Sequence, residues 1–388
     1  MSRFHSYINS SKEILSLYKG DEPFSYFVKR YFSANKKFGS KDRKQVSHLC
    51  YCFFRLGKAA LDLPTEERIL TGLFLCADQP NEILEALKPE WNEKVSLTLD
   101  EKCSMLNALF STGNVFPWEN ELSAGIDYKP FSESFFIQPD LFLRLRPGKE
   151  KSVKEKLQQA AVEFTIISST GLSIATSTKI DEIIELDKEA VVQDYSSQRV
   201  GELLQLIKPE QPVKVWDCCA ASGGKSIMAK DILGAIDLTV SDVRESILIN
   251  LKKRFAAAII KNYKSLIVDL TKPVAALEGE SFNLIIADVP CSGSGTWSRT
   301  PEQLYYFKKE QIEQYALLQR KIITTAIPHL ASGGHLLYIT CSVFKAENEE
   351  AIDFIKQKFH LELIKMELLK GYTNKADTMF AALLKKPL

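Results

Sequence analysis

The chain of 388 residues is 45% hydrophobic and 26% charged, with eight cysteines and a net charge of +1. This composition suits a packed protein of two or three domains and excludes a wholly disordered chain. No apolar run reaches the roughly 18 residues of a membrane span, and the first residues lack the apolar core of a signal peptide. We therefore expect no membrane association and a reducing cytoplasmic location, where free thiols persist.

Positive charge is concentrated near the N-terminus. Residues 1–60 hold twelve Lys or Arg against four Asp or Glu, a net charge of +8, so the rest of the chain carries −7. A basic end on a near-neutral protein favours docking on a polyanion such as RNA. The alternative is a solvated, lysine-rich helical surface.

Apolar residues at helical spacing predict an all-α domain over residues 1–125, with Ser40 as the N-cap of one helix. Further helices are expected at residues 66–76, 80–88 and 99–111. Cys50 and Cys52 lie too close together for a zinc site and have no partner cysteines downstream, so we predict no metal site. Glycines and prolines between residues 112 and 135 predict a domain boundary.

A small α/β module of RRM-like type is predicted over residues 126–190. Leu141, Leu143 and Leu145 alternate with two arginines, Arg144 and Arg146, which predicts a half-buried strand. A helix at about residues 150–161 and two short strands follow. The basic side chains of this module either face RNA or serve packing.

From residue 191 to 388 strands and helices alternate, which predicts a doubly wound, parallel, Rossmann-like α/β sheet. A first helix, Arg199 to Ile207, is expected to be capped by Ser196 or Ser197. Strands are expected at residues 213–217, 238–241, 266–268, 284–287 and 335–340. Helices are expected at residues 225–233, 245–262 and 309–330, the last closed by Gly333-Gly334. Residues 361–369 and 378–384 are expected to form a terminal hairpin, antiparallel to the edge of the sheet.

A turn of small residues, DCCAASGGK at 217–225, follows the first of these strands and opens a helix. Such a turn brings backbone N–H groups and the positive end of a helix to a ligand. A P-loop would need glycine in place of Cys219, and a dinucleotide site would need GxGxxG, so both are disfavoured. S-adenosylmethionine is the remaining candidate.

Acidic residues follow four consecutive strands of this region. They are Asp217, Asp242, Asp269 and Asp288. The carboxyl ends of parallel strands open on one crevice, so we expect all four side chains there. Asp242 is placed to bind ribose hydroxyls, and Asp269 to bind an adenine amino group.

Two thiols also stand at strand ends, Cys291 in ADVPCSGSG and Cys341 in TCS. A thiolate that adds to carbon-6 of a pyrimidine makes carbon-5 reactive toward a sulfonium methyl group. Asp288 is placed to stabilise such an adduct at ring nitrogen 3. The target base must be unpaired or flipped out to reach the site.

Together these motifs resemble the RNA cytosine carbon-5 methyltransferases, in particular their bacterial ribosomal-RNA branch. The matching stretches are QDYSSQ at 193–198, DCCAASGGK at 217–225, SD at 241–242, ADVPCSGSG at 287–295 and TCS at 340–342. The resemblance implies that Cys341 is the nucleophile and that Cys291 takes part in releasing the product. DNA cytosine methyltransferases instead use the thiol of the PC motif.

The resemblance also implies the remaining site residues. The cofactor is expected to be S-adenosylmethionine, bound by Cys219, Ala220, Ala221, Ser222, Gly223, Gly224, Lys225, Asp242, Asp269 and Asp288. The implied catalytic residues are Cys341, Cys291, Asp288 and Lys225. Ser222 departs from the proline of many relatives, and we expect altered loop stiffness there. Residues 41–57 resemble the NusB-like RNA-binding domain that precedes some of these enzymes.

We therefore expect an RNA (cytosine-5-)-methyltransferase domain of class I over residues 191–388, acting on ribosomal RNA as a cytoplasmic monomer. Transfer RNA is an alternative substrate, and a ribosome assembly factor that binds RNA without turnover is an alternative function. A nicotinamide dehydrogenase is disfavoured by the missing GxGxxG.

Overall fold

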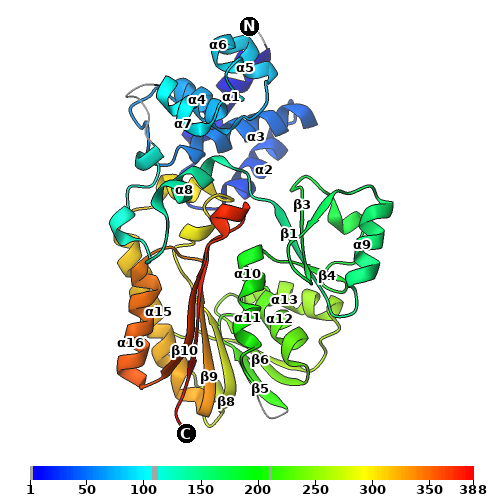
Figure 1. The fold of residues 1–388 in the computed structure, drawn as a ribbon, viewed down its shortest axis with the longest axis vertical. Helices are drawn as coiled ribbons and strands as arrows, with labels where there is room; N and C mark the ends of the chain where they lie inside the picture. The colour runs from blue at the N-terminus through cyan, green and yellow to red at the C-terminus, as the bar shows by residue number, and fades with distance from the viewer. Residues whose placement is uncertain (1–2, 107–111, 209–211) are drawn as a thin grey trace. The chain divides into compact units, whose positions relative to one another are not determined.

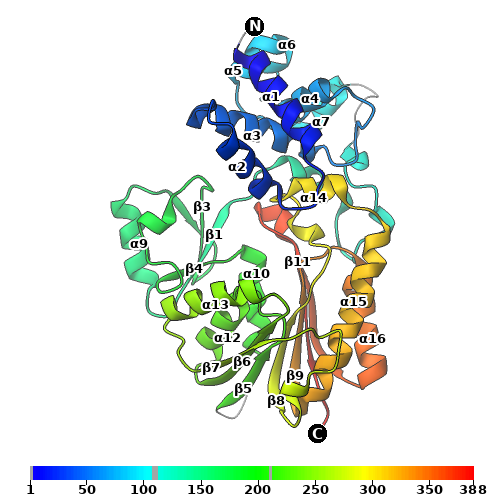
Figure 2. The same ribbon diagram turned by 180° about the vertical axis from the view of Figure 1, so that it is seen from behind.

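The computed structural model describes residues 3–106, 112–208 and 212–388 (Figures 1 and 2). The chain divides into two compact units. The first, here called the helical unit, comprises Met1–Asn120, Ile126–Gln138 and Thr296–Lys309. The second, the sheet unit, comprises Glu121–Gly125, Pro139–Gly295 and Glu310–Leu388. A division into three domains with boundaries near residues 125 and 190 stays a prediction.

The described part of the helical unit contains no strand and agrees with the expected all-α region. Its helices are α1 (Arg3–Leu17), α2 (Phe24–Ala34), α3 (Ser40–Arg55), α4 (Thr65–Cys76), α5 (Glu82–Leu87), α6 (Pro89–Asn92), α7 (Leu99–Met105), α8 (Tyr128–Glu133) and α14 (Pro301–Tyr306). The helix expected at 99–111 includes residues 107–111, which lie outside the described residues. Ser40 is not a cap: α3 begins at Ser40, and Asp42 accepts a hydrogen bond from the backbone N–H of Gly39 at 3.0 Å.

Helix α14 belongs to the helical unit although it lies far along the chain. Glu302 accepts a hydrogen bond from the backbone N–H of Phe24 at 3.2 Å, and Lys58 donates to the carbonyl of Tyr305 at 2.6 Å. A Cβ on Gly57 would lie 2.7 Å from a methyl carbon of Leu304, so glycine at this position leaves room for α14 to pack. Such pairing over long sequence distances leaves no local pattern, and the sequence did not predict it.

Within the sheet unit, residues 141–192 form the predicted small α/β module. Its elements are β1 (Leu141–Leu145), α9 (Glu150–Gln159), β2 (Phe164–Ile166), β3 (Gly171–Ile174) and β4 (Ala190–Val192). The strands form an antiparallel sheet in the order β2-β3-β1-β4. Strand β1 is not half-buried as expected, because Arg144 is buried in an ion pair with Asp231, Nη1 to Oδ2 2.6 Å.

A seven-stranded sheet fills the rest of the unit, in the order β10-β11-β9-β8-β5-β6-β7. Its strands are β5 (Val213–Asp217), β6 (Ile236–Asp242), β7 (Tyr263–Ile267), β8 (Phe282–Asp288), β9 (Leu330–Thr340), β10 (Glu362–Leu369) and β11 (Met379–Lys385). The strands β5 to β9 are parallel, and β11 pairs antiparallel with both β9 and β10. The predicted doubly wound sheet and its antiparallel terminal hairpin are therefore confirmed.

Helices cover both faces of this sheet (Figure 1). They are α10 (Tyr195–Arg199), α11 (Gly201–Leu204), α12 (Gly224–Leu233), α13 (Glu245–Ala257), α15 (Glu310–Ala326) and α16 (Glu349–Phe359). Residues of α11, α12 and α13 share one buried apolar cluster with one face of the sheet, and residues of α15 and α16 share a second cluster with the other face. Strands buried on both sides explain the continuous apolar run at 284–287.

Two further local expectations in this unit are wrong. Asp194, not Ser196 or Ser197, caps α10, since its Oδ1 accepts the backbone N–H of Ser196 at 2.9 Å. Gly333-Gly334 does not close a helix but lies inside β9, where the register with β8 shifts. Gly333 has a φ of +69°, so the pair forms a bulge that glycine accommodates. Among the described residues, no helix has the length and apolarity to cross a membrane.

Candidate active site

A cavity of about 470 Å³ opens at the carboxyl ends of the parallel strands, where the strand order reverses between β5 and β8. Open α/β sheets bind ligands at such a switch point. The loops after five strands line it, together with two residues of α15. The lining residues are Cys218, Cys219, Ala221, Asp242, Val243, Arg244, Val268, Asp269, Leu270, Thr271, Asp288, Val289, Pro290, Cys291, Leu318, Ile322 and Cys341.

Seven of the predicted site residues line this cavity. They are Cys219, Ala221, Asp242, Asp269, Asp288, Cys291 and Cys341. Ala220, Ser222, Gly223, Gly224 and Lys225 belong to the same turn but do not line it. The expectation that Asp217 lies in this crevice is wrong, because its side chain is fully buried and does not line the cavity. Its Oδ2 accepts the hydroxyl of Ser226 at 2.6 Å, and burial raises the pKa of Asp217 to about 7.

The turn between β5 and α12 is held in a conformation that favours small residues. Gly223 has a φ of +84°, and a Cβ there would lie 2.5 Å from a ring carbon of Phe255. Ala221 also lies in the left-handed region, at a φ of +45°, and its N–H donates to Asp242 Oδ2 at 3.1 Å. This hydrogen bond ties the turn to the end of β6. A bound nucleoside would contact both the turn and this strand end.

Asp242 is buried and holds Arg244, which the sequence did not single out. The guanidinium donates to both carboxylate oxygens, Nε to Oδ1 at 3.0 Å and Nη2 to Oδ2 at 3.2 Å. The Arg244 side chain is 57% exposed, so this ion pair costs little to open. Asp242 can therefore exchange the guanidinium for hydroxyl donors of a ligand.

One wall of the cavity is apolar. Its side chains are Val268, Leu270, Val289, Leu318 and Ile322. Asp269 lies at this wall and accepts hydrogen bonds from the N–H and hydroxyl of Thr271, which lower the pKa of Asp269. Apolar side chains together with the carboxylates of Asp242 and Asp269 in one cavity fit a purine nucleoside.

The two thiols meet at the rim. Cys291 follows β8 and Cys341 follows β9, which are neighbouring parallel strands, and their Sγ atoms lie 3.2 Å apart. The hydrogen bond with Cys341, and then burial, raise the pKa of the Cys291 thiol. Either thiol can donate to the other at this distance, and the backbone N–H of Cys341 also donates to the sulfur of Cys291 at 3.4 Å.

A glycine sets the distance between the two loops. A Cβ on Gly295 would lie 1.9 Å from the carbonyl oxygen of Thr378 and 3.1 Å from that of Cys341. The backbone N–H of Gly295 donates to the same Cys341 carbonyl at 2.9 Å. Only glycine permits this approach.

Glu347 joins the two thiol loops and was missed by the sequence reasoning. Its carboxylate accepts hydrogen bonds from the backbone N–H of Ser292 at 2.8 Å, from the hydroxyl of Ser342 at 2.6 Å and from Gln319 at 3.0 Å. The side chain is fully buried, and burial raises the pKa of Glu347. No local pattern marks this residue, because it is one of three acids in the stretch ENEE at 347–350.

Replacing Glu347 by glutamine should loosen both thiol loops. One acceptor oxygen becomes a donor that faces other donors, and losing hydrogen bonds to a buried charge costs about 1.5–3 kcal/mol each. We expect the rate of the methyl transfer that the sequence predicts to fall by about 10- to 100-fold, with unchanged affinity for the predicted cofactor. Single-turnover kinetics and calorimetry measure the two quantities. The exposed neighbour Glu350→Gln is the control, and a wild-type rate in Glu347→Gln would contradict the role.

Lys225 forms an ion pair with Asp288. Its Nζ lies 3.0 Å from Asp288 Oδ2 and donates to the hydroxyl of Ser197 at 2.8 Å. Gln193 also donates to Ser197 Oγ, at 3.1 Å. The QDYSSQ stretch at 193–198 thus holds Lys225 in place through Ser197. The sequence did not predict this role for the stretch.

Comparisons with known proteins agree with this geometry. Residues 204–384 match the family described as 16S rRNA methyltransferase RsmB/F. Ribosomal RNA small subunit methyltransferase B of Xylella fastidiosa is 29% identical over 217 residues, 55% of this chain and 50% of the relative. The protein of the same name from Photorhabdus laumondii is 32% identical over 196 residues, 49% of this chain and 44% of the relative.

Solved structures share the fold. The structure of PH0851 has a TM-score of 0.71 at 20% identity and covers 99% of this chain and 98% of that one. NSun6 from Pyrococcus horikoshii, solved with SFG, has a TM-score of 0.59 at 16% identity and covers 71% of this chain and 96% of that one. These structures confirm the Rossmann-like fold, and the match of residues 204–384 confirms the predicted family resemblance over that stretch. The sequence matches span about half the length of the relatives, and a NusB-like character of the first residues stays a prediction.

Proposed function

We propose that this chain is an S-adenosylmethionine-dependent RNA (cytosine-5-)-methyltransferase that acts on ribosomal RNA of the small subunit. The observation that carries the proposal is the pair of thiols, Sγ to Sγ 3.2 Å, beside Asp288 at the rim of a cavity that fits a nucleoside. The relatives named as small-subunit methyltransferases support the choice of RNA.

The cofactor is S-adenosylmethionine, in agreement with the methyltransferase family that residues 204–384 match. Asp242 would take the ribose hydroxyls, and Asp269 with the apolar wall would take the adenine. The turn at 219–225 would hold the amino-acid end near the start of α12. When bound, the cofactor supplies a methyl group on a sulfonium sulfur.

The protein side of the reaction falls to four residues. The thiolate of Cys341 bonds to carbon-6 of an unpaired cytosine, which makes carbon-5 reactive. Asp288 stabilises the adduct by sharing a proton with ring nitrogen 3, and Lys225 holds Asp288 in place. After methylation a general base takes the carbon-5 proton, the double bond between carbon-5 and carbon-6 reforms, and the bond between carbon-6 and sulfur breaks to return the Cys341 thiolate, with Cys291 assisting release. A cytoplasmic location and a monomeric state stay predictions.

Direct methyl transfer tests this function. The protein is incubated with methyl-labelled S-adenosylmethionine and transcripts of 16S rRNA, 23S rRNA or transfer RNA, and the nucleosides are identified by mass spectrometry. We expect 5-methylcytidine at one position of the 16S transcript. Labelled 5-methylcytidine only in transfer RNA would overturn the substrate, and RNA binding without label on any transcript would favour an assembly factor.

A further inference from the structure

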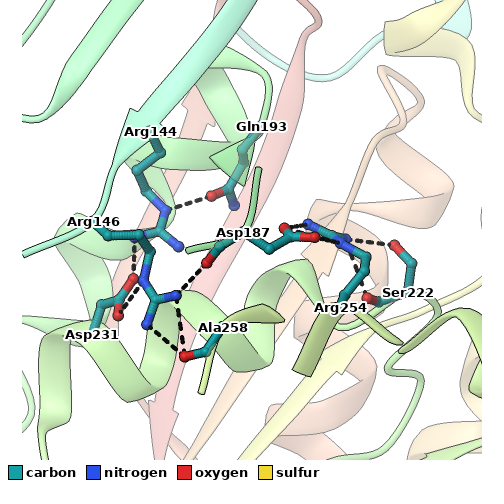
Figure 3. A network of polar contacts seen from close by, with 8 residues as sticks. All are labelled: Arg144, Arg146, Asp187, Gln193, Ser222, Asp231, Arg254 and Ala258. Atoms are coloured by element: carbon teal, nitrogen blue, oxygen red, sulfur yellow. Dashed lines mark hydrogen bonds and ion pairs between the residues drawn. The ribbon is translucent and has the colours of Figure 1, made fainter. Parts of the chain in front are cut away.

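Ser222 belongs to the turn at 219–225 but does not line the cavity. Its hydroxyl and its carbonyl both accept hydrogen bonds from Nη1 of Arg254, at 2.9 and 3.1 Å. Arg254 lies on α13, so the contact joins the turn before α12 to a neighbouring helix (Figure 3). A loop that must order around a ligand gains from such an external anchor.

Arg254 is itself fixed by Asp187. Its Nε and Nη2 donate to both carboxylate oxygens of Asp187, with distances of 2.6 to 3.1 Å. The two side chains are only 23% and 13% exposed, so this bidentate pair is shielded from solvent. The guanidinium therefore presents Nη1 to Ser222 in a fixed orientation.

Asp187 belongs to the small α/β module, which is tied to the same helices. The carbonyl of Asp187 accepts a hydrogen bond from Arg146 Nη1, and Arg146 Nε donates to Asp231 of α12 at 2.9 Å (Figure 3). Arg146, predicted either to face RNA or to serve packing, is thus engaged inside the protein. One polar network runs from the module to the cofactor turn.

We infer that Arg254 is a positioning residue for cofactor binding: held by Asp187 of the small α/β module, it fixes the turn at 219–225 through Ser222. The inference rests on the proposed function, because it assigns that turn to the cofactor. Removing the anchor leaves the cavity walls intact, but the turn must then be ordered at the expense of binding affinity.

Calorimetric titration with S-adenosylhomocysteine tests the inference in a double-mutant cycle. Arg254→Gln is expected to weaken binding about tenfold, a loss of about 1.4 kcal/mol, and Ser222→Ala about threefold to fivefold. The double variant should bind no more weakly than Arg254→Gln alone, because Arg254→Gln already removes the hydroxyl contact that Ser222→Ala deletes. Ser222→Thr, which keeps the hydroxyl, should restore affinity, and Lys253→Gln on the same helix is the charge-matched control.

Hydrogen exchange of the turn, measured without ligand, distinguishes a failure of the positioning role from a failure of the proposed function. Amides of residues 218–225 should exchange faster in Ser222→Ala and Arg254→Gln than in the wild type or Lys253→Gln. Wild-type affinity in both variants, or additive losses in the cycle, would overturn the positioning role. A wild-type protein that does not bind S-adenosylhomocysteine would overturn the proposed cofactor, whatever the exchange data show. Ser222→Ala keeps the Asp187–Arg254 pair, so the test survives if Arg254→Gln fails to fold.

Discussion

Cys341→Ala is expected to abolish methyl transfer, lowering the rate by roughly 10⁴-fold or more, because no other group can activate carbon-5 in its place. The proposed function assigns the nucleophile to Cys341, whose Sγ lies 3.2 Å from that of Cys291. RNA in which 5-fluorocytosine replaces cytosine gives the direct readout. Fluorine cannot leave as a proton does, so the attacking sulfur stays bonded and a slow-migrating adduct appears on a denaturing gel.

Cys291→Ala is the matched control in the same assay. It removes a thiol from the same rim but leaves Cys341, so the adduct should still form, and release of methylated RNA should slow. An adduct that persists in Cys341→Ala and disappears in Cys291→Ala would reverse the two roles and give the arrangement of the DNA enzymes. Binding of S-adenosylhomocysteine should be unchanged in both variants, which shows that each remains folded.

The sequence predicted those parts of the molecule that a local pattern encodes. Apolar runs alternating with segments of helical periodicity predicted the doubly wound sheet. Because its parallel strands end at one edge, Asp242, Asp269 and Asp288 line the same cavity there. The sequence placed Cys291 and Cys341 at strand ends of one sheet, and the pairing of β8 with β9 brings the two thiols together. Residues that follow parallel strands can be predicted to lie near one another, because the carboxyl ends of these strands all lie at one edge of the sheet.

What the sequence did not predict depends on contacts between distant residues. Asp217 ends a strand like the other three acids, yet its side chain is buried and bonded to Ser226. Arg144 has the sequence context of an exposed base, yet it is buried beside Asp231. Glu347 joins the loops of Cys291 and Cys341 only because each loop donates a hydrogen bond to its carboxylate. Each of these roles is set by a partner that no local period reveals.

Asp288→Asn is expected to lower the maximal rate by about 10²- to 10⁴-fold, the range of a lost general acid. Asparagine keeps the shape and can still accept from Lys225, but it cannot share a proton with ring nitrogen 3. Asp269→Asn is the control, since it changes another strand-end acid of the same cavity. It should weaken S-adenosylhomocysteine binding and leave the rate at saturating cofactor nearly intact.

The two variants should therefore divide binding from chemistry. Asp288→Asn should show a low rate with near-normal cofactor affinity, and little 5-fluorocytosine adduct, because the addition of Cys341 to the ring is the step that Asp288 assists. If instead Asp288→Asn loses cofactor affinity and recovers its rate at high cofactor concentration, Asp288 is a binding residue like Asp269. Adduct formation would then depend on Cys341 alone, and the proton at ring nitrogen 3 would need another partner at this rim.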